Sequence, residues 1–285
     1  MVDATMFFKD QKNKIPDLID KKNTTESLPR PYLGMSQLGD ECYRKLFYYF
    51  RWCAKDKIDG RVNRIFQVGH KAEIDMIAAL ESIGVKTWDT LDAQAGFSAV
   101  QNHCRGHSDG MALGIPGAEK TTHLLEFKTS SDKYFKDVVR NGIVKSKPIH
   151  HSQMQLYMHF SGAKRGLYMV YNKNDSSYYC ERVDADSNIA EDLIRKAEDI
   201  ITCENVNEFP KLGNGSPSFF KCRFCNYSDV CHFNVKPVKT CRTCVSADIV
   251  DDGKWECGIT KKELSIEDQV KACENYGILE GFEPQ

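Results

Sequence analysis

The sequence has little that would place the chain in or across a membrane. Its apolar runs are short and interrupted by charged residues, whereas a membrane-spanning helix needs about 20 mostly apolar residues in succession. The first residues, MVDATMFFKDQKNK, also lack the apolar segment followed by small residues that a secretory signal requires. We therefore expect a soluble, cytoplasmic protein with no membrane partner.

An excess of charge of either sign is also missing. The 39 lysines and arginines nearly balance the 40 aspartates and glutamates, and the formal net charge is -1. Overall charge thus gives no general attraction to nucleic acid, and any DNA binding has to rest on local basic patches. The phosphate-binding pattern G-x-x-x-x-G-K-[ST] does not occur either, so a helicase activity would need a separate partner protein.

The chain does contain enough apolar sequence for a sizeable core. Its 285 residues are 41% hydrophobic, and changes in composition divide them into three parts. Residues 1–35 are polar and close on a Leu-Pro-Arg-Pro segment, which indicates a loose leader. Residues 36–235 carry the periodic patterns of a large α/β domain. Residues 236–285 form a cysteine-rich tail that follows a hinge at 213–217.

Apolar spacing predicts the order of elements in the large domain. Helical spacing occurs at 36–49, 61–81, 132–140, 149–160 and 187–203. Segments between residues 96 and 129 predict a meander of three strands, and 166–171 and 177–183 predict a strand pair. We therefore expect a mixed central sheet flanked by helices.

A carboxylate and a lysine stand two positions apart on one of these strands. Alternation along residues 124–129 directs Glu126 and Lys128 to one face, and Leu125 and Phe127 to the other. A hairpin-like return of the preceding chain would bring Asp109 beside Glu126. The sequence thus predicts two carboxylates and an ammonium group around one site.

These groups suit the hydrolysis of a phosphodiester, which needs a hard divalent cation, an activated water and stabilisation of developing charge. Asp109 and Glu126 would hold Mg²⁺ or Mn²⁺, and Glu73 on the helix 61–81 is a further candidate ligand. Lys128 would orient or deprotonate the water and offset negative charge. An isolated Glu-x-Lys on a strand is more often an exposed, ion-paired face, so the prediction depends on the motifs around it.

Those motifs occur in this order along the chain: Gly69-x-x-x-Glu73, Asp109-Gly110, Glu126-x-Lys128 and Gln153-x-x-x-Tyr157. They resemble the motifs of RecB-type nucleases of the PD-(D/E)xK superfamily, a group that includes CRISPR-adaptation exonucleases, AddB-type helicase-nucleases and phage recombination exonucleases. The resemblance covers roughly residues 36–233 and implies a restriction-endonuclease-like core, with Gln153 and Tyr157 in the catalytic site near the scissile phosphate. Relatives often carry histidine where this chain has Glu73.

The resemblance also implies a function. We expect an exonuclease that hydrolyses DNA from its ends, with 5′ to 3′ polarity, in phage-type recombination, repair or replication. Its partners would be DNA ends and a single-strand annealing, single-strand binding or helicase protein, in the host cytoplasm if the chain is viral. Two alternatives stay open: a DNA-binding, nuclease-like scaffold with weak or no catalysis, and a structure-specific endonuclease.

The 12 cysteines point to metal ligands rather than disulfides if the chain stays in a reducing compartment. Cys222, Cys225 and Cys231 form a triplet without a fourth ligand nearby in sequence. Cys42 resembles the lone N-terminal cysteine that iron-sulfur members of this nuclease group pair with such a triplet. This implies a structural 4Fe-4S cluster that closes the nuclease domain. Zinc is the competing occupant, and His232 is an alternative ligand.

A second set of four cysteines lies in the tail: Cys241, Cys244, Cys257 and Cys273. The tail is too small to fold around an apolar core alone, and this spacing suits a zinc ribbon or knuckle; unrelated cysteines are the alternative. Four residues would supply a miniature core: Trp255, Ile259, Leu264 and Tyr276. The other cysteines are expected to be ordinary buried residues: Cys53, Cys104, Cys180 and Cys203.

A basic stretch follows the Glu-x-Lys strand and is expected to bind DNA: Lys133, Lys136, Arg140, Lys145 and Lys147. It continues into His150 and His151. A solvated helix face is the alternative for any such run of charge. Arg44, Lys45 and Arg51, near Cys42, form a second candidate for DNA contact.

Overall fold

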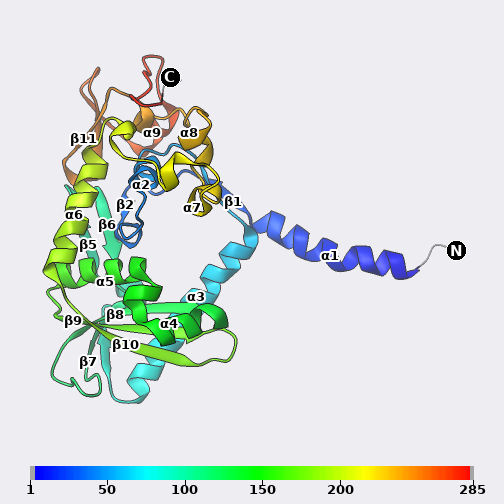
Figure 1. Ribbon diagram of the computed structural model, residues 1–285, viewed down its shortest axis with the longest axis vertical. Coiled ribbons are helices and arrows are strands. Elements are labelled where there is room, and N and C mark those ends of the chain that lie inside the picture. The colour runs from blue at the N-terminus through cyan, green and yellow to red at the C-terminus, as the bar shows by residue number, and fades with distance from the viewer. Residues whose placement is uncertain (1–3, 283–285) are drawn as a thin grey trace.

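The structure, a computed structural model, describes residues 4–282 and mixes helices with several small sheets (Figure 1). Over these residues the α-helices are α1 (Ala4–Asn23), α2 (Tyr43–Phe50), α3 (Gly60–Ser82), α4 (Asp132–Ser146), α5 (Pro148–Ser161), α6 (Ser187–Thr202), α7 (Phe220–Arg223), α8 (Ser228–His232) and α9 (Ile266–Lys271). The strands are β1 (Thr25–Ser27), β2 (Leu33–Gly34), β3 (Asp56–Ile58), β4 (Lys86–Trp88), β5 (Gly96–Ala99), β6 (Cys104–His107), β7 (Gly110–Leu113), β8 (His123–Ser130), β9 (Arg165–Asn172), β10 (Tyr178–Asp184), β11 (Ala247–Val250), β12 (Lys254–Cys257) and β13 (Lys262–Leu264). Within this described part of the chain, no helix has the length and apolar character needed to cross a membrane.

The largest sheet is mixed and has the strand order β10-β9-β8-β7-β4. Strands β8 and β9 run parallel, with α4 and α5 forming the crossover between them, and the other neighbours pair antiparallel. Helix α3 packs on one side of β8, and α5 packs against the same strand. The expected α/β class, with a mixed sheet flanked by helices, is therefore confirmed.

Alternation along β8 separates two buried faces. Leu125 belongs to a cluster with Met76 of α3, whereas Leu124 belongs to a second cluster with Met154 of α5. Because successive side chains on a strand point to opposite faces, Glu126 and Lys128 share the face of Leu124, toward α5. The local pattern of the strand thus decides where its charged groups lie.

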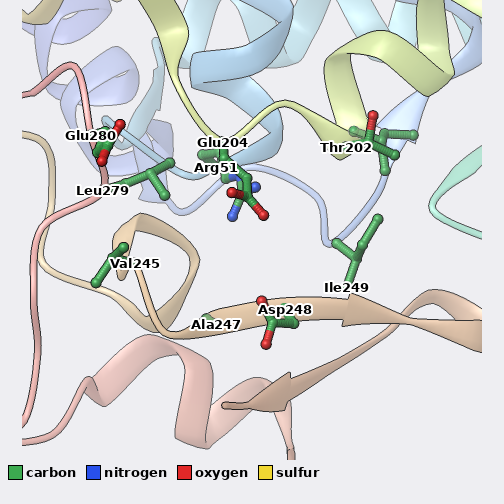
Figure 2. Close-up of a pocket in the computed structure, with 10 residues that line it drawn as sticks. Arg51, Thr202, Glu204, Val245, Ala247, Asp248, Ile249, Leu279 and Glu280 are labelled. Atoms are coloured by element: carbon green, nitrogen blue, oxygen red, sulfur yellow. The ribbon is translucent and has the colours of Figure 1, made fainter. Parts of the chain in front are cut away.

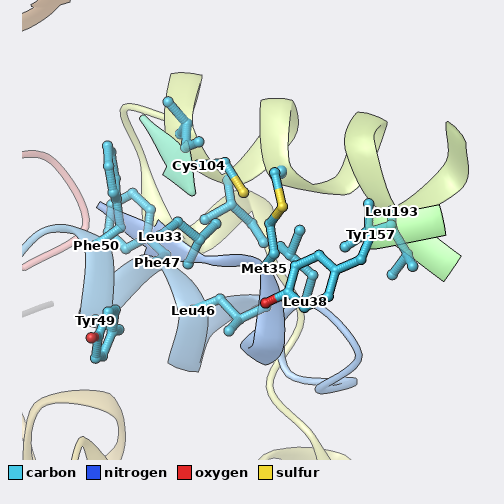
Figure 3. Packing of buried hydrophobic residues seen from close by; sticks show 14 of the residues in the cluster. Leu33, Met35, Leu38, Leu46, Phe47, Tyr49, Phe50, Cys104, Tyr157 and Leu193 are labelled. Carbon is cyan, nitrogen blue, oxygen red and sulfur yellow. The ribbon is translucent and has the colours of Figure 1, made fainter. Parts of the chain in front are cut away.

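The second cluster extends far beyond the sheet. Figure 3 shows side chains from residues 33–38, α2, β6, α5 and α6 packed together, including Leu33, Phe47, Cys104, Tyr157 and Leu193. Full burial of a large apolar side chain contributes roughly 1.5–3 kcal/mol. Helix α2, buried over most of its surface, is therefore a central element of this part of the core.

Two predicted elements differ from the structure. The helix expected at 36–49 begins only at Tyr43, because Asp40 accepts a hydrogen bond from the Cys42 N–H at 2.9 Å in the turn before it. The prediction of one three-stranded meander is wrong, since β6 pairs with β5 and β2 in a separate sheet while β7 pairs with β8. Residues 100–102, all with positive φ, form the tight turn between β5 and β6.

Much of the expected loose leader is ordered. Helix α1 projects from the body (Figure 1), and its last turns are tied to α3 by a 2.5 Å ion pair between Asp20 and Arg64. Asn63 also donates to the carbonyl of Asn23 at 2.7 Å. Leu33 is fully buried and pairs with β6 through β2. Strands β1 and β2, on either side of the Pro29–Pro31 segment, have only three and two residues. Strands this short show no detectable period, which is why the sequence pattern does not indicate them.

The cysteine-rich tail shares the core of the N-terminal residues. Arg242 is fully buried, and its guanidinium lies 4.1 Å from the centre of the Trp52 ring and 4.8 Å from that of Trp255. It donates to the carbonyl oxygens of Phe50 at 3.1 Å and Pro31 at 2.9 Å. Arg242 therefore joins the C-terminal tail to segments near the N-terminal end of the chain.

Two expectations about burial are wrong. Ile259, predicted to belong to a miniature core, is 54% exposed because it lies in the turn after β12, while Trp255 is buried in the shared core. Cys180, predicted to be buried, is exposed because β10 is an edge strand and turns this side chain outward. Cys53, Cys104 and Cys203 are buried as expected.

Arg44 and Arg51 are also placed differently from the DNA-contact prediction. Both are buried: Arg44 donates to the Phe209 carbonyl at 2.7 Å, and Arg51 donates to the Cys203 carbonyl at 2.9 Å. Figure 2 shows Arg51 at a pocket of about 340 Å³ between the end of α6 and β11. Lys45 is half-exposed but is paired with Asp40 at 2.7 Å. These arginines stabilise the fold instead of facing DNA.

We predict that Arg242→Ala lowers the free energy of unfolding by roughly 2–4 kcal/mol, because it leaves buried carbonyls without donors. Urea unfolding measures the change. The matched control is Arg195→Ala, whose side chain is 63% exposed, with an expected change within about 0.5 kcal/mol. Equal effects of the two substitutions would contradict the central role of Arg242.

Candidate active site

Asp109 and Glu126 are brought together by the pairing of β7 with β8. The register places Gly110 opposite Leu125, so that Asp109 lies beside Glu126. The Phe127 N–H donates to Oδ2 of Asp109 at 2.6 Å, which fixes the carboxylate against the edge of β8. The predicted return of the chain is therefore present, although it arises from β7 rather than from a continuous meander.

Glu126 is the most enclosed charged group of the site, with no exposed surface. Lys128 donates to its Oε1, and Gln153 donates to its Oε2 at 3.1 Å. The same amide nitrogen of Gln153 lies 3.4 Å from the hydroxyl of Tyr157, which is also buried. The predicted Glu-x-Lys and Gln-x-x-x-Tyr motifs thus meet face to face, from β8 and α5.

Glu73 approaches from α3, where its carboxylate is half-buried and accepts a hydrogen bond from Gln94 at 2.8 Å. Burial and the charge of Asp109 raise the pKa of Glu73. Glu73 therefore lies close enough to Asp109 to feel its charge, and the charge of Lys128 also acts on it, in the opposite direction.

The electrostatics of the site are those of crowded carboxylates. Burial raises the pKa of Glu126 to about 8; Lys128 opposes this shift, and Asp109 and Glu73 add to it. Burial works against the charge of Lys128, but Glu126 and Asp109 outweigh it and raise the pKa of Lys128 above its ordinary value. The lysine therefore stays protonated, and the carboxylates favour the addition of further positive charge.

No group of three or more histidine, cysteine or acidic side chains within residues 4–282 is arranged to hold a metal ion. For the carboxylates the reason is visible, since Asp109 and Glu126 face the donors of Phe127, Lys128 and Gln153. Metal binding by Glu73, Asp109 and Glu126 stays a prediction.

A cavity of about 450 Å³ opens over Lys128, Gln153 and Tyr157. Two arginines and two histidines also line this cavity: Arg30, Arg105, His107 and His150. Of these, only His150 belongs to the basic stretch that the sequence predicts to bind DNA. The strand period could have indicated two of them, because positions 105 and 107 share one face of β6. A Pro-Arg-Pro segment offers no such signal for Arg30.

Tyr32 holds the two arginines of this wall in place. The guanidinium carbons of Arg30 and Arg105 lie 5.3 Å and 5.6 Å from the centre of its ring. Arg30 is further held by the Tyr49 hydroxyl at 3.1 Å, and Arg105 donates to the Asn102 carbonyl at 2.7 Å. The guanidinium groups of Arg30 and Arg105, each held by these contacts, therefore border the cavity above Glu126 and Lys128.

Gly106 lies between Arg105 and His107 on β6. Because it has no side chain, β6 can pack closely against Tyr157. A Cβ atom there would lie 2.7 Å from the Tyr157 hydroxyl, well inside contact distance. His150 is neutral, because burial and the charges of Lys128 and Lys147 lower its pKa to about 3.

The basic stretch predicted to bind DNA lies on α4, directly after the end of β8. Its side chains are exposed over most of the helix: Lys133, Lys136, Arg140 and Lys145. Lys136 pairs with Asp132 at 2.8 Å, and Lys147 lies 4.6 Å from the centre of the Tyr134 ring. The position is compatible with a track leading to Lys128, and DNA contact there stays a prediction.

The first cysteine set is brought together from both ends of the domain. A cavity of about 420 Å³ is lined by Cys42, Cys222 and Cys225. Burial raises the pKa of Cys42, with a contribution from the nearby thiols of Cys225 and Cys231. His232, the alternative ligand, hydrogen-bonds to the backbone of Gly215. The presence of a cluster stays a prediction.

The four cysteines of the tail surround a smaller space than the first set does. Cys241, Cys244, Cys257 and Cys273 all line one cavity of about 20 Å³. Burial and the other three thiols raise the pKa of Cys241 to about 11. All 12 cysteines of the chain are free.

Known protein families and curated proteins offer no match to this chain. Solved structures to which this chain is similar include SSO0001, with a TM-score of 0.40 and 18% identity over 71% of this chain and 86% of that one. The alkaline exonuclease LHK-Exo from Laribacter hongkongensis has a TM-score of 0.45 and 16% identity, covering 60% and 86%. Its complex with dAMP has a TM-score of 0.44 and 15% identity, with the same coverage. With TM-scores under 0.5, these similarities establish neither a family nor an activity for this chain.

We predict that Glu126→Gln stabilises the metal-free protein at pH 8 but not at pH 4. The pKa of Glu126 is raised on folding from the ordinary 4.5 to about 8, so its ionisation lowers stability progressively as pH rises through that interval. The free energy of unfolding in chelator, measured at both pH values, tests this. Glu198→Gln, at an exposed position of α6, is the control and should change stability by less than about 0.5 kcal/mol at either pH. A variant less stable than the native protein at pH 8 would refute the idea that burial disfavours the charge of Glu126.

Proposed function

We propose that the chain is a DNA exonuclease that hydrolyses phosphodiester bonds from DNA ends with Mg²⁺ or Mn²⁺. The observation that carries the proposal is the ion pair between the buried Glu126 and the partly exposed Lys128, beside Asp109 and below a cavity walled by arginines. The sheet of β4 and β7–β10 with α3, α4 and α5 would then be a restriction-endonuclease-like core. The motif resemblance supports the RecB-type branch of the PD-(D/E)xK superfamily for this core.

Asp109 and Glu126, assisted by Glu73, are the proposed ligands of the divalent cation. Oxygen donors with negative charge are what a hard cation prefers. The pKa values of Glu73 and Glu126 are raised first by burial and further by the neighbouring carboxylates, so an added positive charge would stabilise the ionised forms. When bound, such a cation acidifies water and neutralises charge on the phosphate. The chemistry of these oxygen donors therefore fits the cation, although in the described residues the carboxylates are not already arranged around one.

Lys128 acts in this proposal as a cation rather than as a base, because the surrounding carboxylates raise its pKa. Its ammonium group orients the attacking water and offsets the negative charge that develops on the phosphate. Gln153 holds Glu126 from α5 at 3.1 Å, and Tyr157 supports Gln153. Both are positioned to contact the strand that enters the cavity.

Arg30 and Arg105 are the proposed contacts to the phosphates next to the scissile bond, since planar guanidinium groups bind phosphate in a bidentate manner. The basic side chains of α4 would extend this track along the duplex or single strand. Preference for ends, 5′ to 3′ polarity and a role in phage-type recombination, repair or replication follow from the motif resemblance. A single-strand annealing, single-strand binding or helicase protein would be the partner.

Cys42, Cys222, Cys225 and Cys231 are the proposed ligands of a 4Fe-4S cluster. Cys42, Cys222 and Cys225 line a cavity of about 420 Å³, which has room for a cluster, and Cys231 lies near enough to Cys42 to act on its pKa. The tail cavity of about 20 Å³ suits one ion. Pro148 and Ile149, at the start of α5, line the same cavity. The cluster would thus support the helix that carries Gln153 without entering the chemistry.

We expect anaerobically purified protein to degrade end-labelled linear DNA with Mg²⁺ or Mn²⁺, and Lys128→Ala to reduce the rate by at least about 100-fold. The position of the label released first gives the polarity. Lys120→Ala, at an exposed turn beyond the other end of β8, is the control and should retain full activity.

Covalently closed circular DNA run in parallel separates the alternatives. Degradation of linear DNA alone supports the exonuclease, whereas cleavage of circles supports an endonuclease. DNA binding without degradation by the native protein would replace the proposal with a scaffold role.

We further expect Arg105→Gln to weaken binding to single-stranded DNA about tenfold and to lower the slope of log Kd against log salt by about one unit, because one phosphate contact is lost. Fluorescence anisotropy over a salt series measures both. The control is Arg61→Gln, an exposed position at the start of α3. An unchanged slope for Arg105→Gln would exclude this residue from phosphate contact.

A further inference from the structure

The four tail cysteines converge from three separate elements. Cys241 and Cys244 bracket a single turn in which the Cys244 N–H donates to the Cys241 carbonyl at 3.0 Å. Cys257 ends β12, and Cys273 follows α9. All four line the cavity of about 20 Å³, whose other lining residues carry no charge. The four thiols are the number and kind of soft ligand that one zinc ion takes, although within residues 4–282 they are not already arranged around an ion.

We propose that these four cysteines hold one zinc ion, and that the ion fixes the tail hairpin that supports Arg105 in the wall of the catalytic cavity. The cavity has room for one small ion, since about 10–15 Å³ already admits a single water. Four sulfur ligands leave no open position, which is the arrangement of a structural zinc site. Cys241 donates weakly to the Asp268 carbonyl at 3.5 Å, and metal binding would replace this contact with a zinc–sulfur bond.

The turn between Cys241 and Cys244 connects the ion to the N-terminal residues. It presents Arg242, whose hydrogen bonds to Pro31 and Phe50 hold the segment just after Arg30. Gln269 of α9, a helix that leads into Cys273, accepts from the same guanidinium at 2.8 Å. Zinc would therefore link the Cys241–Cys244 turn, which carries Arg242, to α9, which contacts it through Gln269.

The β11–β12 hairpin connects the ion to the other arginine of the wall. Its Gly253 N–H donates to the Gln101 carbonyl at 2.7 Å, and the carbonyl of Val250 lies 2.8 Å from Nε2 of His103. Gln101 belongs to the turn at residues 100–102, which leads into β6 and Arg105. Nη2 of Arg105 lies 3.5 Å from the Asp252 carbonyl of the hairpin. A Cβ atom at Gly253 would lie 2.4 Å from the same nitrogen, so the hairpin packs directly on this side chain. Cys257, at the far end of β12, sets where that hairpin lies.

Metal analysis of the native protein tests the site. We expect about one zinc ion per chain, and Cys257→Ser should lower this at least about fivefold while leaving the iron content unchanged. Cys225→Ser is the matched control and should do the reverse if the proposed cluster is present. Cys180→Ser, at an exposed cysteine outside both sets, should change neither. Zinc-free native protein would overturn the proposal.

Hydrogen exchange tests the link to the cavity wall. In Cys257→Ser we expect the amides of residues 100–105 to exchange at least about tenfold faster, while those of β8 and β9 stay unchanged. If that variant does not fold, the same measurement is made on native protein from which zinc has been removed by a chelator. Zinc loss without faster exchange at 100–105 would overturn the positioning role.

The zinc site and the exchange measurement stand independently of the nuclease proposal, whereas the consequence for DNA rests on it. If Arg105 contacts phosphate, Cys257→Ser should weaken binding to single-stranded DNA about as much as Arg105→Gln, and the two changes together should weaken it no further. Fully additive effects would show that zinc does not act through Arg105.

Discussion

The ion pair between the buried Glu126 and the partly exposed Lys128 constrains the elements around it. Removing the charge of Glu126 from water disfavours folding by several kcal/mol, and its attraction to Lys128 offsets this only when hydrogen bonds satisfy the remaining groups. Gln153 supplies such a bond from α5, and Asp109 is fixed alongside by the backbone of β8. The central strand, the crossover helices and the neighbouring hairpin therefore have to take up one arrangement for the pair to be tolerated.

The elements that hold this pair are those the sequence predicts best. Helices α3, α4, α5 and α6 and strands β8–β10 are long enough for their period to be detected, and alternation places Glu126 and Lys128 on one face without any structure. The short strands β1–β3 and the change of sheet between β6 and β7 depend on contacts between distant residues. No local pattern encodes those contacts, so the expected meander and the expected loose leader differ from the fold.

Charge is easier to predict than exposure. Arg44 and Arg51 look like surface residues in sequence, yet they are buried and donate to distant carbonyls. Arg30 and Arg105, which border the cavity, stand in segments with no basic run. The difference is set by tertiary packing: α2 is enclosed on nearly all sides, whereas Tyr32 holds the other two arginines at an open wall.

The position of the tail along the chain has a consequence for the order in which the site is completed during translation. Every reacting group of the proposed site has been synthesised by Tyr157, but the contacts of Arg242 and of the 250–253 turn come almost a hundred residues later. A nascent chain thus carries its carboxylates and lysine while one wall of the cavity is still missing. The cavity can therefore become complete only after the 250–253 turn has been synthesised, well after the catalytic residues themselves.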